Sequence, residues 1–475
     1  MSIKGLLLPV FSLPNKYGIG DFGKECFKFI TLLKKSGFNT WQILPLNPIS
    51  YGHSPYQPYS SYAIEDLYLS LDDFIKEGLL DKVPSFRRNK NHVDYEKVRL
   101  FKEPIYKKAF NNYLNKYGEE ALINFAKENL KIDQYAKFMT LKEFNNGLSF
   151  DKWDKNLYID EKAFHEKYLF YLFKQYYALK QWNNVHNFAK ENGIVIVGDI
   201  PFYVGYDSSD VYYNKQYFLL DSNDNMTFVA GVSPDYFSSL GQRWGNPIYN
   251  FDELRKDNFS FLIDRIIYAS SLYDKVRIDH FRAFDTYYLI PSDKLDARIG
   301  EWKYAPGYEI FDRLFSVKPD IDIIAEDLGN LRDEVYYLRD HYHFPGMNVL
   351  QFTIDTFLNH NINNFDGFNN VITYIGTHDN ETLTGFISKM KMSYKTKLKK
   401  YFNSLNIYSN NLNDMFLKFA FRNFNNVIIS FVDLLGVNNH GRINIPSIVN
   451  DTNWTYKLSS FDKLKYYMKK EYWYV

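Results

Sequence analysis

GIVIVGDIPF, residues 193–202, is a short apolar run that ends abruptly at a carboxylate, Asp199. Strands that are buried on both faces of a parallel sheet read as continuous apolar runs of this kind. KVRIDHF, residues 275–281, has the same form and ends in Asp279 and His280. The two runs together predict buried parallel strands whose carboxyl ends carry charged side chains.

Five more runs of this kind occur along the chain: TWQILPLNP (40–48), DIDIIAEDLG (320–329), MNVLQFTID (347–355), VITYIGTHDN (371–380) and VIISFVDLLG (427–436). Segments with helical periodicity, such as residues 22–37, separate most of them. Seven strands that alternate with helices predict an α/β fold, a (β/α)8 TIM barrel. A doubly wound parallel sheet is the competing arrangement, but no glycine-rich dinucleotide or phosphate fingerprint follows the first strand.

The spacing between residues 48 and 193 is too large for a single connecting helix. Residues 66–185 are rich in Lys, Phe and Tyr and contain helical stretches such as residues 103–130. We therefore expect one catalytic barrel domain over residues 1–475, with a mostly helical insertion at 66–185.

The bulk composition limits the possible partners and the compartment. Lys plus Arg number 57 and Asp plus Glu 56, so the net charge of +1 gives no electrostatic reason to expect nucleic acid or an anionic membrane as partner. No apolar stretch has the length that a bilayer span requires. Cys26 is the only cysteine, which excludes an intrachain disulfide and suits a reducing, cytoplasmic location. The oligomeric state is left open.

Carboxylates recur where the predicted strands end: Asp199, Asp279, Glu326 and Asp379. In a (β/α)8 barrel, the carboxyl ends of the strands carry the chemistry. One such carboxylate could be a helix N-cap or a member of a structural ion pair. Four of them, two adjoining His280 and His378, indicate an active site instead.

The neighbours of these carboxylates indicate how they divide the chemistry. Residues alternate sides along a strand, so Arg277 and Asp279 point the same way, and the guanidinium favours the ionised carboxylate. Apolar residues precede Glu326 and Asp327 follows it, which would raise its pKa, as a general acid requires. One ionised and one protonated carboxyl group are typical of glycoside chemistry, with retention if they stand roughly 5 Å apart.

Longer motifs carry a family resemblance: GLLLPVFSLPNKYGIGDFG (5–23), WQILPLNP with YGHSPYQPYSSYA (41–63), GDIPFYVGYDSSDVY (198–212), GVSPDYFSSLGQRWGNPIY (231–249), VRIDHFRAF (276–284), IIAEDLG (323–329), GTHDNET (376–382), VDLLG (432–436) and INIPSIVNDTNW (443–454). The chain resembles the 4-α-glucanotransferases called amylomaltase or disproportionating enzyme, of glycoside hydrolase family 77 type and related to the α-amylase barrels. It departs from the pattern at residues 64–66, which read Ile-Glu-Asp where the family usually has a Gly-Asn-Pro turn. The barrel motifs run almost to residue 475, so no separate C-terminal β-domain is expected.

The resemblance implies a role for each candidate site residue. Asp279 would be the nucleophile, Glu326 the acid/base, and Asp379 the third carboxylate that holds sugar hydroxyls. Residues 231–247 would form an active-site lid loop. The remaining positions would bind substrate: Ser54, Tyr56, Asp199, Arg277, Tyr236, Phe237, Trp244, His280 and His378.

The implied activity is transfer of α-1,4-glucan segments from a maltodextrin donor to glucose or another maltodextrin, without a cofactor or a metal. An α-1,4-glucan hydrolase on the same barrel and a non-catalytic maltodextrin-binding protein are the alternatives. A phosphate-binding barrel enzyme would need a glycine-rich cradle near the last strands, and residues 432–446 make a poor one.

Overall fold

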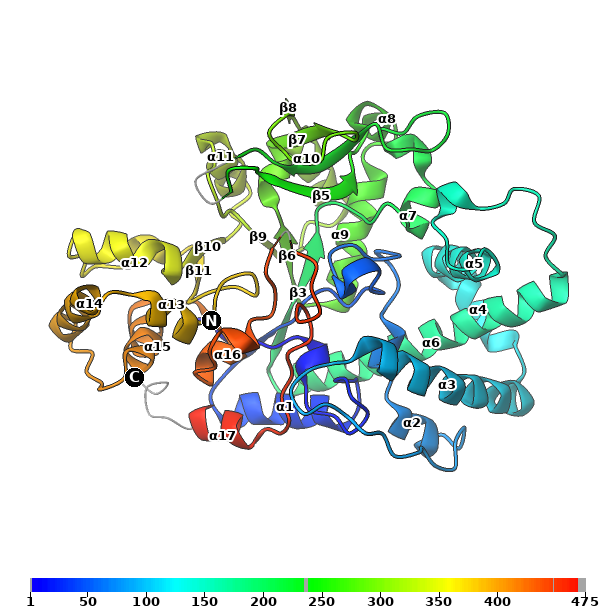
Figure 1. Ribbon diagram of the computed structural model, residues 1–475, viewed down its shortest axis with the longest axis horizontal. Helices are drawn as coiled ribbons and strands as arrows, with labels where there is room; N and C mark the ends of the chain where they lie inside the picture. Colours follow the sequence, from blue (N-terminus) through cyan, green and yellow to red (C-terminus); the bar gives the residue numbers. More distant parts are fainter. Residues whose placement is uncertain (1, 235–237, 447, 469–475) are drawn as a thin grey trace.

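Eight parallel strands form the centre of the protein in a computed structural model that describes residues 2–234, 238–446 and 448–468 (Figure 1). Their order in the sheet is β10-β11-β12-β1-β2-β3-β6-β9. The backbone N–H of Ala325 in β9 donates to the carbonyl of Pro345, directly before β10, at 3.0 Å. This contact brings the two outer strands together, and the predicted (β/α)8 barrel is confirmed. The strands are β1 (Lys4–Leu7), β2 (Thr40–Gln42), β3 (Val195–Pro201), β6 (Lys275–Asp279), β9 (Ile323–Ala325), β10 (Gly346–Val349), β11 (Val371–Tyr374) and β12 (Val427–Ser430).

The seven predicted runs supply seven of these strands, and β1 is the eighth. β1 pairs with both β12 and β2, although its apolar run is short and Pro9 follows soon after. Some predicted runs were too long. Residues 347–355 leave the strand after Val349 and continue as a helix. The run shows no boundary there because β10 is buried along its whole length and α12 continues with buried Leu350 and Ile354.

Helices surround the barrel and follow most of its strands (Figure 1). They are α1 (Lys24–Lys35), α7 (Ser209–Tyr212), α8 (Phe251–Lys256), α9 (Ser260–Leu272), α10 (Gly307–Val317), α11 (Asp333–His341), α12 (Leu350–Asn359), α13 (Leu383–Lys389), α14 (Met392–Ser404), α15 (Leu412–Asn423), α16 (Phe431–Leu434) and α17 (Asp462–Met468). Short 3₁₀ helices are η1 (Val10–Ser12), η2 (Tyr51–His53), η3 (Asp66–Tyr68), η4 (Phe150–Lys152), η5 (Lys215–Tyr217), η6 (Phe281–Phe284), η7 (Asp366–Phe368) and η8 (Asn439–Gly441). In α1, Cys26, Phe29, Ile30 and Leu33 repeat at helical spacing and are fully buried. No helix in the described ranges combines the length and apolarity that crossing a membrane demands.

Residues 66–185 form a helical layer beside the barrel, drawn from blue through cyan in Figure 1. It contains α2 (Leu71–Lys76), α3 (Tyr95–Tyr117), α4 (Glu120–Glu128), α5 (Leu130–Phe144) and most of α6 (Glu161–Glu191). Ion pairs hold its helices to the point where the chain enters it: Lys174 Nζ lies 2.7 Å from Asp66, the first residue of the layer, and Arg99 contacts the preceding Glu65 at 2.9 Å. α6 also leads directly into β3, so this helix belongs to the layer and to the barrel wall.

A second sheet stands apart from the barrel and was not anticipated from the sequence. Its four antiparallel strands, in the order β5-β4-β7-β8, are β4 (Phe228–Val232), β5 (Gln242–Pro247), β7 (Thr286–Pro291) and β8 (Glu301–Tyr304). Figure 1 shows it at the top of the view, beyond the ends of β3 and β6. Both ends of residues 231–247 therefore lie in paired strands.

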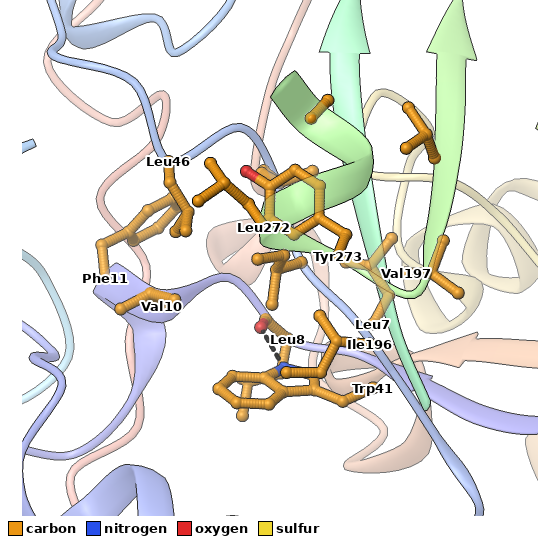
Figure 2. Close-up of a cluster of buried hydrophobic side chains, with 14 of the residues drawn as sticks. Leu7, Leu8, Val10, Phe11, Trp41, Leu46, Ile196, Val197, Leu272 and Tyr273 are labelled. Atoms are coloured by element: carbon orange, nitrogen blue, oxygen red, sulfur yellow. Dashed lines mark hydrogen bonds between the residues drawn. The ribbon is translucent and has the colours of Figure 1, made fainter. Parts of the chain in front are cut away.

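The core under β1, β2 and β3 is closely packed (Figure 2). The indole Nε1 of Trp41 donates to the carbonyl of Leu8 at 2.8 Å, so a large apolar ring is buried with its polar atom satisfied. Gly198, next to Asp199 in β3, lies against the ring of Tyr273. A Cβ at Gly198 would stand 2.0 Å from Tyr273 Cδ2, so only glycine fits.

We expect Gly198→Ala to lower the free energy of unfolding by about 1–3 kcal/mol, because the added methyl overpacks a rigid contact. Urea denaturation measures the change. Gly367→Ala is the matched control, because its Cβ would meet no atom within 4 Å, and it should change stability by less than about 0.5 kcal/mol. Equal stability of the two variants would contradict the packing argument.

Candidate active site

The register of the barrel brings the predicted carboxylates together. Asp199 pairs directly with Arg277 across β3 and β6, so both side chains lie on one face. Ile278 pairs with Ala325 across β6 and β9. Asp279 and Glu326 come one residue later on these two neighbouring strands, at the same end of the barrel.

A buried guanidinium connects the first two carboxylates. Arg277 Nη1 donates to both oxygens of Asp199, at 2.8 and 2.7 Å, and Nη2 lies 3.0 Å from Asp279 Oδ1. The hydroxyl of Tyr56 donates to Asp199 Oδ2 at 2.7 Å. The side chain of Asp199 is 0% exposed and that of Asp279 is 30% exposed. Asp199 therefore holds Arg277 from inside the barrel, and Asp279 is the carboxylate that a ligand can reach.

Glu326 is held beside Asp279 by backbone donors. The N–H of His280 donates to Glu326 Oε2 at 2.7 Å, and the N–H of Leu328 donates to Oε1 at 3.1 Å. His280 has a left-handed backbone with φ 56° and ψ 50°, which is uncommon outside glycine. This turn points the N–H of the residue after Asp279 at Glu326. Backbone strain of this kind concentrates at functional sites.

Burial and mutual charge separate the two carboxyl groups in pKa. Burial raises the pKa of Asp279 to about 6; Arg277 opposes this shift, and the charges of Asp199 and Asp379 add to it. The sequence led us to expect that Arg277 would hold Asp279 ionised. The guanidinium does lower its pKa, but the desolvation is larger, so the net shift is upward. Burial, followed by the charge of Asp279, raises the pKa of Glu326 well above its usual range.

Asp379 is oriented by a segment near the end of the chain. The side-chain amide of Asn444 donates to Asp379 Oδ1 at 2.6 Å, and its backbone N–H donates to the carbonyl of His378 at 3.1 Å. Arg442 donates to the carbonyl of Asp379. His378 Nε2 lies 3.5 Å from Asp379 Oδ1. Arg442 and Asn444 were not singled out from the sequence, although Asn444 stands in one of the quoted motifs.

Three rings lie together next to these carboxylates. The ring of Tyr56 stacks on His378 with centroids 5.3 Å apart, and Trp454 lies 5.7 Å from each of them. Sequence reasoning identified the first two and missed Trp454. The hydroxyl of Ser54 accepts from the backbone N–H of Tyr56 at 3.3 Å, so it shapes the turn that presents this ring.

Residues 231–247 reach the candidate site through Trp244. Its ring meets His280 edge-on at 4.7 Å, and its carbonyl accepts from the Gln57 side chain at 2.7 Å. His280 Nε2 is buried without a hydrogen-bond partner, and burial lowers the pKa of this ring to about 3, so the imidazole is neutral. The predicted contributions of Tyr236 and Phe237 lie outside the described residues.

The donor set favours an organic ligand rich in hydroxyl groups. The carboxylates are bound by a guanidinium, backbone N–H groups and an amide, which leaves Asp279 and Asp379 partly exposed. Over the described ranges, no group of three or more His, Cys, Asp and Glu side chains is placed to hold a metal ion.

Removal of the buried guanidinium should be costly. We expect Arg277→Met to lower the free energy of unfolding by about 3–5 kcal/mol, because Asp199 is left buried without its counter-charge. Chemical denaturation measures the loss. The surface pair Arg255–Glu309, both about half exposed, provides the control: Arg255→Met should cost less than about 1 kcal/mol. An equally small loss in Arg277→Met would contradict the assigned role.

Comparison with known proteins agrees with this geometry. A family model described as 4-alpha-glucanotransferase matches residues 8–463. The 4-alpha-glucanotransferase of Aquifex aeolicus is 36% identical over 488 residues, covering 99% of this chain and 98% of the relative. That of Thermus thermophilus is 38% identical over 84% of this chain and 82% of the relative. The solved structure of an amylomaltase from Streptococcus agalactiae in complex with acarbose superposes with a TM-score of 0.91 at 32% identity, over 99% of this chain and 98% of that one.

The family match and these relatives span nearly the whole chain, including the strand ends that carry Asp279, Glu326 and Asp379. The barrel itself, matched by the same solved structure, places those residues at one end. The chain therefore belongs to the 4-α-glucanotransferase family.

Proposed function

We propose that this enzyme moves α-1,4-glucan segments from a maltodextrin donor to the 4-hydroxyl of glucose or another maltodextrin, by double displacement with retention. One observation carries the residue assignment. Arg277 contacts the partly exposed Asp279, and the backbone N–H of His280, the residue after Asp279, donates to Glu326. Two carboxyl groups with different protonation therefore stand side by side, as retaining glycoside chemistry requires. The acarbose bound by the Streptococcus agalactiae relative supports a glucan-like ligand.

In the first displacement, ionised Asp279 attacks C1 of a glucosyl unit, and the C1–O4 bond breaks. The departing 4-oxygen takes the proton of Glu326, whose raised pKa keeps it protonated near neutrality. The reducing-end piece of the donor leaves, and the rest of the donor remains as a glycosyl ester on Asp279.

In the second displacement, the 4-hydroxyl of an acceptor sugar attacks C1 of the ester. Glu326, now ionised, takes the hydroxyl proton, and the carboxylate of Asp279 is released. Loss of the ester also restores the negative charge beside Glu326, which raises its pKa again. The pair thus returns to its starting protonation without an outside acid or base.

The surrounding residues would bind and orient the sugar. Asp379, fixed by Asn444, would accept hydrogen bonds from hydroxyls of the reacting ring. The neutral, unpartnered Nε2 of His280 would take another hydroxyl, together with His378. The ring of Tyr56 would stack on the sugar, while Asp199 and Arg277 would act through the position of Asp279.

Transfer rather than hydrolysis requires that water be kept from the glycosyl ester. We assign this role to the lid loop, residues 231–247. The hydrogen bond from Gln57 to the Trp244 carbonyl ties this segment to the loop that carries Tyr56. The helical layer at residues 66–185 is a further part of the proposed single domain and braces the same loop through Glu65. A cytoplasmic location fits the single, buried cysteine, Cys26.

Incubation with maltotriose tests the activity and the nucleophile. The wild-type protein should give free glucose and a ladder of longer maltodextrins without any added cofactor. Asp279→Asn should lower the rate on the order of 10⁴-fold or more, with an unchanged melting temperature. Asp285→Asn, a nearby carboxylate that faces Arg332, should retain activity. Glucose and maltose alone, with rising reducing ends, would instead indicate a hydrolase.

The pH dependence of kcat/KM tests the two protonation states. Activity should fall on the acid side near pH 6, where Asp279 becomes protonated, and on the alkaline side where Glu326 ionises. The charge of Asp379 raises the pKa of Asp279, so in Asp379→Asn the acid limb of the residual activity should move to lower pH. Asp293→Asn, an exposed carboxylate that is paired with Lys294, should leave it in place. An unmoved acid limb in Asp379→Asn would contradict the assignment.

A further inference from the structure

The loop that carries Tyr56 is closed at its base by Glu65. This Tyr56 loop comprises residues 46–65, between β2 and the helical layer. The backbone N–H of Glu65 donates to the carbonyl of Leu46 at 2.7 Å, and the backbone N–H of Ile49 donates to Glu65 Oε2 at 2.8 Å. Two further hydrogen bonds cross the loop, from the Asn47 side chain to the carbonyl of Ala63 and from the N–H of Tyr59 to the carbonyl of Pro48. The path of the loop therefore depends on the position of one carboxylate.

This carboxylate is buried and takes its counter-charge from the helical layer. The side chain of Glu65 is 1% exposed. Arg99, on α3, donates through Nη2 to Glu65 Oε1 at 2.9 Å and through Nη1 to Asp66 Oδ1 at 3.1 Å. Burial raises the pKa of Glu65 to about 7, and the charge of Arg99 opposes this rise. Because a buried charge is costly unless it is paired, the ionised form of Glu65 depends on Arg99.

The residues on either side of Glu65 are held by α6 as well. Lys174 Nζ lies 2.7 Å from Asp66 Oδ2, and both side chains are buried. Burial would raise the pKa of Asp66, but the charges of Lys174 and Arg99 lower it. The side chain of Gln175 accepts from the backbone N–H of Ile64 and donates to its carbonyl, each at 2.8 Å. Loss of Arg99 should therefore leave Ile64 and Asp66 in place and act mainly on Glu65.

The other end of the Tyr56 loop enters the active site, where the ring of Tyr56 stacks on His378. The base of the loop is joined to this end through Ser50. Ser50 follows Ile49 directly, and its hydroxyl donates to the carbonyl of Gln57, the residue after Tyr56. A displacement of Ile49 would therefore be passed to the residues that carry the ring.

We propose that Arg99 is a positioning residue for the glucan site, which holds ionised Glu65 at the base of the Tyr56 loop and thereby keeps the Tyr56 ring in place to bind sugar. Without Arg99, the unpaired charge of Glu65 would turn toward water, and its hydrogen bond from Ile49 would open. Arg99 acts through Glu65 and not through the sugar. The effect on sugar binding rests on the proposed stacking of Tyr56 on the glucan, whereas the fixing of the loop does not, so the two are measured separately.

Hydrogen–deuterium exchange of the full-length protein measures the fixing of the loop. In Arg99→Met, the backbone amides of residues 46–57 should exchange about tenfold faster, because a hydrogen bond to a charged group is lost from the loop base. Lys108→Met is the matched control. Lys108 lies on the same helix, but its partner Asp81 is exposed and 4.0 Å away, so exchange should stay at the wild-type rate.

A double variant separates the unpaired charge from lost packing. Arg99→Met combined with Glu65→Gln leaves no charge buried at the loop base, and the amide oxygen of the new side chain can still accept from Ile49. Most of the protection of residues 46–57 against exchange should therefore return. A double variant whose loop exchanges as fast as that of Arg99→Met would overturn the proposal, because lost packing would then be the cause.

The kinetics of maltotriose turnover measure the effect on sugar binding. In Arg99→Met, KM should rise about threefold to tenfold with kcat within about twofold of wild type, because a displaced ring weakens the binding of substrate and transition state alike. A merely structural role would lower the folded fraction, and therefore kcat, at an unchanged KM. The double variant should return KM toward the wild-type value.

The two measurements keep this proposal apart from the proposed function. Equal exchange in Arg99→Met and Lys108→Met would overturn the role of Arg99, and faster exchange at an unchanged KM would overturn its link to sugar binding. A wild-type protein without any turnover would contradict the proposed function instead, and exchange would still decide whether Arg99 fixes the loop. Should Arg99→Met fail to fold, Arg99→Gln is compared with Lys108→Gln in the same way, because both side chains are about half exposed.

Discussion

The buried ion pair between Arg277 and Asp199 is the constraint on which the rest of the site depends. Two charges at 4% and 0% exposure are tolerable only if nearly every donor and acceptor is satisfied. The pair meets this condition because β3 and β6 place the two residues in register, and because Tyr56 and Asp279 take the remaining positions. The barrel register, the orientation of Asp279, the proposed nucleophile, and the loop that carries Tyr56 are therefore fixed together.

The charge of Arg277 also explains why the pKa values of the neighbouring Asp279 and Glu326 differ. Burial raises both pKa values, so burial alone would leave the pair alike. Arg277 lies at contact distance from Asp279, whereas Glu326 is hydrogen-bonded by backbone N–H groups, is affected by the charge of Arg277 without an ion pair, and has Asp279 and Asp327 as negative neighbours. The guanidinium therefore limits the rise in the pKa of Asp279, and Glu326 is the carboxyl group with the higher pKa. Asymmetry of contact, more than burial, therefore distinguishes the proposed nucleophile, Asp279, from the proposed acid, Glu326.

The sequence predicted the parallel barrel because strands buried on both faces leave a local signal, an unbroken apolar run. Apolar runs are limited in two ways as a predictor of strands. This signal did not identify β1, whose apolar run is short and is followed by Pro9, and it does not show where a strand passes into a buried helix, as at Leu350. The antiparallel sheet left no such trace. Strands β4 and β7 pair although β6 lies between them in the sequence. The family resemblance implied a lid loop at residues 231–247, and both ends of this range are paired strands.

The candidate site likewise contains residues that the sequence predicted and residues that it did not. The carboxylates could be predicted because each follows an apolar run, and parallel strands bring their carboxyl ends to one place. The groups that orient them could not, since Asn444, Trp454 and Gln57 reach the site from loops whose positions depend on the finished fold. The hydrogen bond from the His280 N–H to Glu326 depends on the left-handed backbone of His280, which its residue type does not predict. Strands thus supply the charges of this site, and loops supply their orientation. It follows that the charged residue types of the site can be predicted locally from the sequence, whereas their orientation rests on contacts between distant segments.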